Sequence, residues 1–210
     1  MTGGAGYLGS VLVPVLLAHG DRVTVVDLFT YGTDALGAVA GDPRLVLRRA
    51  DITEPDLLPA LLGGIDAVVH LAGIANDATC ALDPTLTVTT NHAAVLRLAR
   101  QASREGVRTF VFASSCAIFG DTGGRAVDED APATPVSLYA RTKLTTEREL
   151  LPMAASGFSP VSLRFATLFG LSPRMRLDLA VNYLTACAAG GRPLVMHGGG
   201  RQYRPFLHVR

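Results

Sequence analysis

The sequence contains a single lysine, Lys143, and a tyrosine stands four residues before it. The other 18 basic residues are all arginine, so keeping lysine here indicates a need for a compact ammonium group with a perturbable pKa. Tyr139 and Lys143 lie one helical turn apart on one helix face. With five tyrosines in 210 residues, chance places one at this offset roughly one time in forty. An ammonium group stabilises a nearby phenolate, so the pair predicts a tyrosine that acts as a base.

Two serines follow a short apolar stretch, residues 109–113, that reads as a buried strand. Ser114 and Ser115 stand at its carboxyl end, where ligands bind in parallel sheets. A hydroxyl group in that place can donate a hydrogen bond to a reacting oxygen. Capping of the following turn is the alternative role, and it suits Ser114 better than Ser115.

Three glycines, Gly3, Gly6 and Gly9, lead directly into a predicted helix. This spacing lets the backbone turn tightly and approach a pyrophosphate, whose charge then sits against the helix N-terminus. The next predicted strand ends at Asp27, where a carboxylate can accept hydrogen bonds from an adenosine ribose and repel a 2′-phosphate. The combination favours NAD over NADP, although Asp27 taken alone also fits a solvated acid at a strand end.

Composition excludes several classes of protein. A net charge of +1 supplies no basic stripe for a phosphate backbone, so nucleic acid is a poor partner. The three cysteines share no metal-binding spacing and are odd in number, which predicts neither a zinc site nor a disulfide framework and fits a reducing cytoplasm. No basic leader and no apolar run of ~18 residues is present, so we expect no signal peptide and no membrane span.

The chain alternates β-branched runs with longer helical stretches, as strand–helix–strand units around a parallel sheet do. The predicted strands are residues 22–26, 45–48, 65–71, 109–113 and 161–165. The predicted helices are residues 7–19, 54–62, 85–105 and 136–155. Residues 120–135, rich in Gly, Pro, Asp and Ala, are predicted to form a surface loop. The fold class is therefore α/β, a doubly wound parallel sheet of Rossmann type.

After Phe165 the pattern changes. Residues 168–176 are irregular, residues 177–189 predict a helix, and residues 193–196 and 206–209 predict short strands. We expect an NAD-binding domain over residues 1–165 and the start of a smaller substrate-binding lobe over residues 166–210.

These motifs run in the order of a known family. The sequence resembles the extended short-chain dehydrogenase/reductase family, the NAD-dependent sugar-nucleotide epimerases and dehydratases. The resemblance covers essentially the whole chain and is carried by Thr2–Gly9, Asp27, Asp51-Ile52, His70–Gly73, Asn91, Ser114-Ser115 through Phe119-Gly120, Tyr139-x-x-x-Lys143, Leu163–Gly170 and Arg204–Val209.

The resemblance implies a role for each matching residue. Tyr139 would be the catalytic base, Ser115 the catalytic hydroxyl residue, and Lys143 would bind the nicotinamide ribose while lowering the pKa of Tyr139. Asp27 would hold the adenosine ribose. The other implied cofactor contacts are Gly3, Gly6, Tyr7, Leu8 and Gly9 at the pyrophosphate, Asp51 and Ile52 at the adenine, and Leu71, Ala72, Gly73 and Asn91 along the cleft. The implied substrate contacts are Ser115, Arg204 toward a diphosphate, and Asn182; no metal ligand is predicted.

The predicted chemistry is hydride transfer between NAD and a nucleotide-linked sugar. Tyr139 would remove a hydroxyl proton while hydride leaves the same carbon, with Ser115 hydrogen-bonding the developing carbonyl. The family's 4,6-dehydratases have an Asp-Glu pair after the catalytic hydroxyl residue, whereas Cys116-Ala117 stands here. Dehydration is therefore disfavoured, and epimerisation or ketone reduction is expected. No basic neighbour marks Cys116 as a nucleophile, and His70 is expected to be positional rather than catalytic.

Two features depart from the family pattern. Only Met1 precedes Thr2, where family members place a complete central strand. We therefore expect two neighbouring strands to lack a ladder partner and the underside of the glycine-rich loop to be exposed. The sequence ends at Arg210, where family members continue, which predicts an incomplete substrate site. A shortened sequence, a naturally reduced protein and a degenerate copy are competing explanations.

These departures support a second hypothesis, a truncated or non-catalytic module that only binds a dinucleotide. The intact set of Ser115, Tyr139 and Lys143 argues against it, because a binding role does not need those residues. The resemblance further implies a homodimer that packs through the helices at residues 85–105 and 136–155.

Overall fold

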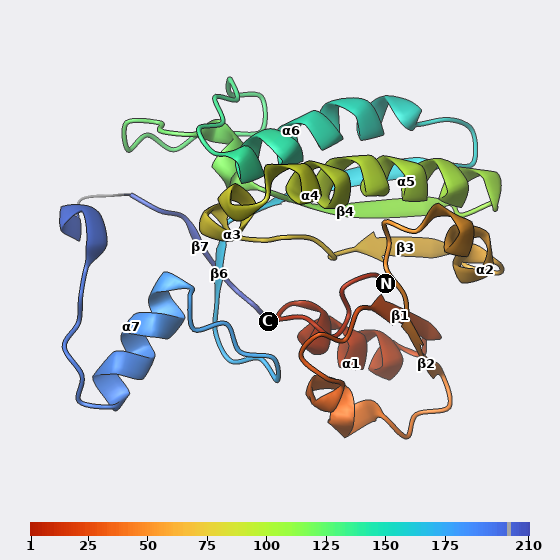
Figure 1. Cartoon of the computed structure of the whole chain (residues 1–210), viewed down its shortest axis with the longest axis horizontal. Helices are drawn as coiled ribbons and strands as arrows, with labels where there is room; N and C mark the ends of the chain where they lie inside the picture. The colour runs from red at the N-terminus through yellow and green to blue at the C-terminus, as the bar shows by residue number, and fades with distance from the viewer. Residues whose placement is uncertain (201–202) are drawn as a thin grey trace.

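Helices cover both faces of a parallel sheet in the computed structural model, which describes residues 1–200 and 203–210 (Figure 1). The strands are β1 (Val23–Asp27), β2 (Leu45–Arg49), β3 (Ala67–His70), β4 (Thr109–Ser115), β5 (Ser159–Phe165), β6 (Thr167–Phe169) and β7 (Phe206–His208). The α-helices are α1 (Gly9–His19), α2 (Leu58–Leu62), α3 (Asp77–Leu82), α4 (Pro84–Val88), α5 (Ala94–Arg104), α6 (Leu138–Leu150) and α7 (Ala180–Ala189). Short 3-10 turns are Asp34–Val39, Pro55–Leu57, Cys116–Phe119, Leu151–Met153 and His197–Gly200.

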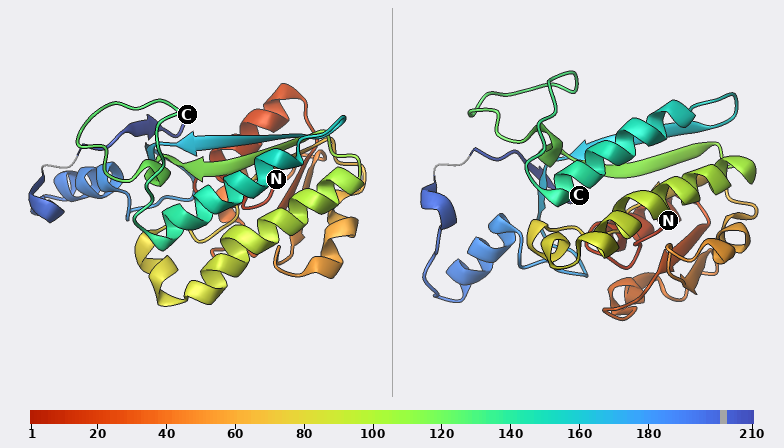
Figure 2. Two further views of the ribbon diagram at one scale, coloured as in Figure 1. Left: turned by 90° about the horizontal axis from the view of Figure 1, so that it is seen from above. Right: turned by 45° about the horizontal axis from the view of Figure 1, so that its top comes forward.

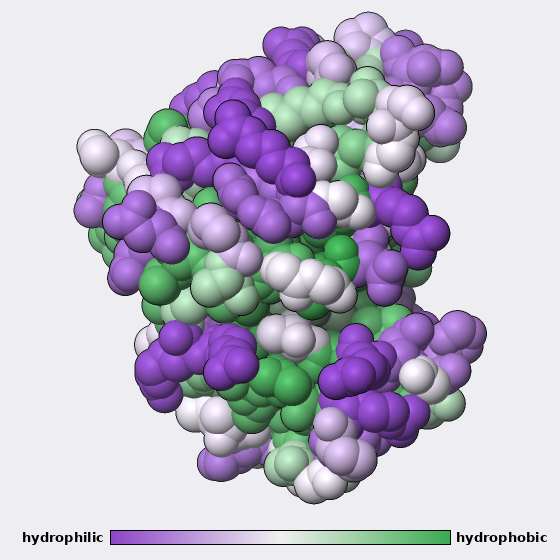
Figure 3. Space-filling model, turned by 90° about the vertical axis from the view of Figure 1, so that its right-hand side faces the viewer, coloured by the Kyte–Doolittle hydropathy of each residue, from purple (hydrophilic) through white to green (hydrophobic). Residues whose placement is uncertain are grey.

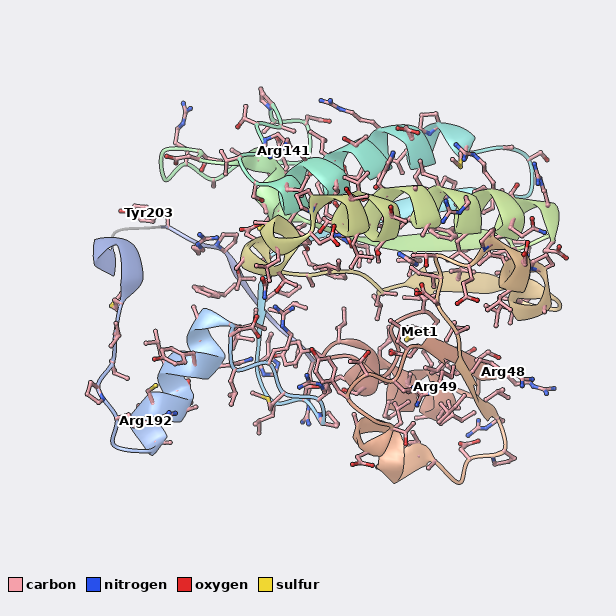
Figure 4. All side chains as sticks on the ribbon, viewed as in Figure 1. Met1, Arg48, Arg49, Arg141, Arg192 and Tyr203 are labelled. Carbon is pink, nitrogen blue, oxygen red and sulfur yellow. The ribbon has the colours of Figure 1, made fainter. Side chains whose placement is uncertain are left out.

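The main sheet consists of two groups of strands. Strand β1 pairs with β2, and β3, β4 and β5 pair in that order, every pair being parallel. Thr2 joins the groups through bridges to Val26 of β1 and His70 of β3. Figure 4 shows Met1 between the two groups. All five strands therefore present their carboxyl ends on one side, as the doubly wound fold requires.

The expected gap between β1 and β3 is present along most of their length. Among the described residues, only the stretch from Met1 to Gly3 hydrogen-bonds to both strands, for example from Thr2 N to Val69 O at 3.0 Å. An apolar cavity of about 30 Å³ lies beside it, and hydrophobic side chains show in the middle of the face in Figure 3. The expectation of an exposed underside was wrong, because Val25 packs beneath the glycine-rich loop and Thr2 is buried.

Each group of strands has its own apolar core. Helix α1 packs on β1 through Val13, Leu17 and Val25. Helices α5 and α6 lie side by side on the opposite face (Figure 2), and Phe110 and Phe112 of β4 are fully buried beneath them. This packing holds α6 against β4.

Several predicted elements differ in the structure. The helix expected over residues 85–105 is divided into α4, a π-helical turn at Thr89–Ala93, and α5. Residues 193–196 form no strand, because they pair with none of the strands in the described part of the chain. The stretch expected to be irregular contains part of β6, which pairs in parallel with β7.

All three cysteines are free thiols. Among the helices in the described part of the chain, none is both long enough and apolar enough to cross a membrane.

Candidate active site

Helix α6 carries Tyr139 and Lys143 to the end of β4. The Ser137 side chain caps the helix by accepting a hydrogen bond from Ala140 N at 3.1 Å, so Tyr139 falls in the first turn. Lys143 is 7% exposed, and its Nζ donates a hydrogen bond to Ala113 O at 2.7 Å. The same Nζ lies 5.7 Å from the centre of the Tyr139 ring.

Ser115, the last residue of β4, reaches the same place. Its Oγ accepts a hydrogen bond from Ala117 N at 3.2 Å, and the same hydroxyl group is near enough to Tyr139 to lower the pKa of that phenol. Ser115 therefore caps the following turn, the role expected of Ser114. Ser114 is buried instead, and its Oγ has no hydrogen-bond partner within the part of the chain the structure describes. The three predicted catalytic residues are thus brought together.

Burial is the largest influence on the electrostatics of this site. Burial raises the pKa of Tyr139, while the Ser115 hydrogen bond and then the positive charge of Arg176 oppose that rise. Burial also lowers the pKa of Lys143 to about 8. The effect of Lys143 on the pKa of Tyr139 stays a prediction. In this structure the ammonium group is directed at Ala113 O, and burial is the largest influence on the pKa of Tyr139.

The glycine-rich loop forms a cradle that side chains would fill. Gly3 has a φ of +69°, and a Cβ there would lie 2.6 Å from Ala72 N. A Cβ on Gly9 would lie 2.6 Å from Gly3 O. Helix α1 has no side-chain N-cap, and within the described residues the N–H groups of Tyr7 and Leu8 have no acceptor. Such open donors at a helix N-terminus fit an anion, as a dinucleotide's pyrophosphate is.

Asp27 ends β1 directly beside this loop. Its carboxylate accepts hydrogen bonds from Ala5 N at 3.0 Å and Phe29 N at 2.9 Å, which holds it in place. At the end of β2, Asp51 accepts hydrogen bonds from the backbone and hydroxyl of Thr53, and Ile52 is buried. The carboxyl ends of β1 and β2 thus line one side of the loop.

The residues after β3 form the opposite wall. Leu71 N donates to Thr2 O at 3.0 Å, and Ala72 N donates to Thr2 Oγ1 at 3.4 Å. Gly73 lies so close to Asn91 that a Cβ would be 2.8 Å from Asn91 Oδ1. Asn91 is 1% exposed, and its amide accepts from Ile74 N and donates to Ile74 O. Its side chain supports the wall from behind rather than facing the cleft.

The other two predicted substrate residues, Asn182 and Arg204, lie in different surroundings. Asn182 of α7 is buried, and its amide already bonds to Gly170 N, the Tyr7 hydroxyl and Arg176 O. Arg204 is exposed, and its charge acts on the nearby Cys116 thiol. Burial nevertheless raises the pKa of Cys116, which disfavours a nucleophilic thiolate.

Two further side chains, Arg176 and His70, contribute to the candidate site, and the spacing of residues in the sequence did not indicate their roles. Arg176 pairs with Asp178 and places a positive charge near Tyr139. His70 is 1% exposed and shares a hydrogen bond of 2.8 Å between its Nδ1 and Thr2 Oγ1. Burial lowers the pKa of His70 to about 3, so the ring is neutral and holds the glycine-rich loop to β3. No local signal marks Arg176, since it stands in an irregular stretch.

The chain belongs to the NAD dependent epimerase/dehydratase family, whose model matches residues 1–210. It is 33% identical to UDP-glucuronic acid decarboxylase 1 of Arabidopsis thaliana over 100% of this chain and 48% of that protein. It is 34% identical to UDP-glucose 4-epimerase of Corynebacterium glutamicum over 81% of this chain and 51% of that protein. The chain therefore spans about half the length of either relative.

The fold also matches solved members of the family. UDP-glucuronic acid 4-epimerase from Bacillus cereus, in complex with UDP-glucuronic acid and NAD, superimposes with a TM-score of 0.88 at 31% identity. That match covers 99% of this chain and 68% of the other. Relatives of near-equal identity catalyse decarboxylation and epimerisation, so the comparisons establish the reaction type of the family rather than one activity.

Proposed function

We propose that the chain catalyses NAD-dependent oxidation and reduction at a hydroxyl-bearing carbon of a nucleotide-linked sugar, as an epimerase or a ketoreductase. The observation that carries the proposal is the convergence of Ser115, Tyr139 and Lys143 at the end of β4. The glycine-rich cradle lies at the same edge of the sheet, because Thr2 bridges directly to β3. Oxidation of an alcohol needs a base and a hydride acceptor side by side. Tyr139 would be the base, and NAD bound at the glycine-rich cradle would be the hydride acceptor.

The cleft would hold NAD through residues from several strands and the glycine-rich loop. Gly3, Gly6 and Gly9 leave room for the pyrophosphate, and the N–H groups of Tyr7 and Leu8 would bind it. Asp27 would hold the adenosine ribose, and its charge disfavours NADP. Asp51 and Ile52 would border the adenine, and Leu71, Ala72 and Gly73 would line the cleft, with Asn91 behind them. When bound, NAD would accept a hydride from the sugar carbon and return it.

Residues of the chain itself would accept and return the proton of the sugar hydroxyl group. Tyr139 would take the proton of the sugar hydroxyl at its phenolic oxygen, and Ser115 would hydrogen-bond the oxygen that becomes a carbonyl. Lys143 would bind the nicotinamide ribose through its buried ammonium group. Arg176, which opposes the rise in the pKa of Tyr139, would help the phenolate to form.

Epimerisation or ketone reduction suits the site better than dehydration. Cys116 and Ala117 occupy the turn after Ser115, and neither side chain can serve as a carboxylic acid or its conjugate base. Arg204, which is exposed and near Cys116, would bind a substrate diphosphate. A non-catalytic dinucleotide-binding module is the second candidate, favoured by the gap between β1 and β3.

We further propose that the protein pairs with a second copy through α5 and α6. These helices lie side by side on the outer face of the sheet, where two copies can form a bundle of four helices (Figure 2).

The proposal is tested by adding NAD⁺ and NADH to the purified chain and measuring binding by fluorescence of the reduced nicotinamide. UDP-glucose and UDP-glucuronic acid are then offered, and absorbance at ~340 nm follows net reduction while NMR follows inversion at C4. Inversion without net change of NADH indicates an epimerase. Binding of NADH without turnover, in a folded sample, favours the non-catalytic module, and no binding at all removes the proposal.

A further inference from the structure

The hydroxyl group of Tyr7 points out of the glycine-rich loop and into the C-terminal part of the chain. It donates a hydrogen bond to Gly170 O at 2.7 Å and accepts one from Asn182 Nδ2 at 3.1 Å. The Tyr7 side chain is 7% exposed, so these bonds form away from water. Only the tertiary fold brings the partners together, because they stand 163 and 175 residues from Tyr7.

A second pair of hydroxyl groups makes the same connection. Ser172 Oγ donates to the carbonyl oxygen of Tyr7 at 2.7 Å and lies 2.9 Å from Ser10 Oγ. Both serines are buried. The glycine-rich loop is thus bonded to the C-terminal segment through the backbone and the side chain of the same residue.

Asn182 extends the connection along the segment. Its Oδ1 accepts a hydrogen bond from Gly170 N at 2.9 Å, and its Nδ2 donates to Arg176 O at 3.0 Å as well as to Tyr7. Asn182 is 6% exposed, so every polar atom of this amide is used inside the protein. The Tyr7 hydroxyl is therefore bonded directly to the backbone at Gly170 and, through Asn182, to the backbone at Arg176.

Residues 170–178, here called the strap, touch both sides of the dinucleotide cleft. The guanidinium group of Arg174 lies 3.8 Å from the centre of the Tyr31 ring, beyond the end of β1. Arg176 Nη2 lies 3.4 Å from Ala75 O, beyond the end of β3. Arg176 also acts on the Tyr139 phenol. The strap thus connects the glycine-rich loop to the catalytic tyrosine.

We propose that Tyr7 is a positioning residue whose hydroxyl group, through Asn182, holds the strap and Arg176 beside Tyr139 when the glycine-rich loop is occupied. The inference rests on the proposed function, because the occupant it assumes is the pyrophosphate of NAD. An anion bound to the N–H groups of Tyr7 and Leu8 restrains the loop, and the Tyr7 hydroxyl passes that restraint to the strap. Coupling between two sites acts equally in both directions, so ordering of the strap also strengthens binding of the NAD pyrophosphate at the glycine-rich loop.

Amide hydrogen exchange with and without saturating NAD⁺ tests the connection directly. In the wild-type chain we expect NAD⁺ to slow exchange over residues 170–182 by about fivefold or more, the lower end of typical coupling between sites. Tyr7→Phe keeps the ring and removes only the hydroxyl, and we expect it to lose that effect while the loop itself stays protected. Tyr31→Phe is the matched control, because Tyr31 is 74% exposed and its ring remains under Arg174.

A second measurement, the pKa of Tyr139, tests whether the loss of the Tyr7 hydroxyl group affects Tyr139. The chain has five tyrosines and no tryptophan, so tyrosinate absorbance is unobscured, and Tyr139→Phe identifies the signal of Tyr139. Because Arg176 opposes the rise in the pKa of Tyr139, we expect Tyr7→Phe to move that pKa upward. A residue with a merely structural role would leave it in place.

The outcomes separate the two proposals. If the wild-type chain binds no NAD⁺, both fall. If NAD⁺ binds but residues 170–182 exchange alike in wild type and Tyr7→Phe, the proposed function stands and the connection is refuted. If Tyr7→Phe fails to fold, Asn182→Ser, whose shorter side chain cannot reach Tyr7, must show the same loss for the inference to survive.

Discussion

The ammonium group of Lys143 donates its hydrogen bond to the carbonyl oxygen of Ala113, 2.7 Å away at the end of β4. This bond joins α6 to β4 one helical turn after Tyr139 and two residues before Ser115. The relative position of the three proposed catalytic residues is therefore set by how one helix packs on one strand. Single changes to this junction, and to the glycine-rich loop on the same edge, should have separable effects.

Replacing Tyr139 by Phe should abolish turnover while the protein still binds NADH. The change removes the proton acceptor and keeps the aromatic ring, so we expect the rate to fall about 10²- to 10⁴-fold. Initial rates with a nucleotide sugar and NADH fluorescence titration measure the two effects. Tyr183→Phe, on α7, is the control and should behave as wild type. Full turnover by Tyr139→Phe would remove the proposed mechanism.

The buried charge of Lys143 should be visible in the pH dependence of stability. Its folded pKa of about 8 lies below the ordinary value of 10.5, so the unfolded chain binds more protons between those pH values. The stability penalty is complete below pH 8 and disappears as the pH rises toward 10.5.

Lys143→Met carries no such penalty. The unfolding free energy of wild type should therefore rise relative to this variant over the same pH range, by on the order of 3 kcal/mol. Urea titrations of both proteins at several pH values give the difference. A constant difference would show that Lys143 is not desolvated.

Substitution of Asp27 by Asn should relax the preference for NAD over NADP. The variant keeps an acceptor for the N–H groups of Ala5 and Phe29 but loses the charge that repels a 2′-phosphate. We expect the ratio of the two dissociation constants to change about tenfold or more. Fluorescence titration with NADH and NADPH measures it. Asp51→Asn is the control, and an equal effect there would point to net charge alone.

Gly3→Ala should destabilise the protein and prevent NAD binding. A Cβ at φ +69° would lie 2.6 Å from Ala72 N, and Thr2 and His70 hold the surrounding backbone in place. We expect a loss of about 1–3 kcal/mol. Gly37→Ala is the matched control, because no atom lies within 4 Å of the added carbon. Thermal unfolding compares the two, and equal stabilities would contradict the geometry of the loop.

Breaking the ion pair between Glu147 and Arg164 should lower the free energy of unfolding far more than breaking an exposed pair. Glu147 of α6 is buried, and its Oε2 lies 2.9 Å from Arg164 Nη2 on β5. Arg164→Met leaves an uncompensated buried carboxylate, which costs about 3–5 kcal/mol. Arg108→Met removes the pair with Asp66, which is 84% exposed, and should cost less than about 1 kcal/mol. Similar losses in denaturant unfolding would show that Glu147 is solvated.

The local features of this protein could be predicted from its sequence. The spacing of Gly3, Gly6 and Gly9 and the four-residue step from Tyr139 to Lys143 depend on backbone turns and helix geometry, which neighbouring residues determine. The apolar strands and the order of the motifs likewise indicated the α/β fold and the family. The helix over residues 85–105 was missed in part, because its π-helical turn is a property of local packing rather than of the hydrophobic pattern.

Only the tertiary structure decided what surrounds each of these residues. Burial raises the pKa of Tyr139, and the side chains of Asn91 and Asn182 are buried as well. Burial depends on contacts between segments that are far apart in the chain. The contacts from Tyr7 to Gly170 and from Arg176 toward Tyr139 likewise join residues that no local pattern relates. The residue types in the site follow from the sequence, whereas their protonation and their partners follow from long-range packing that excludes water.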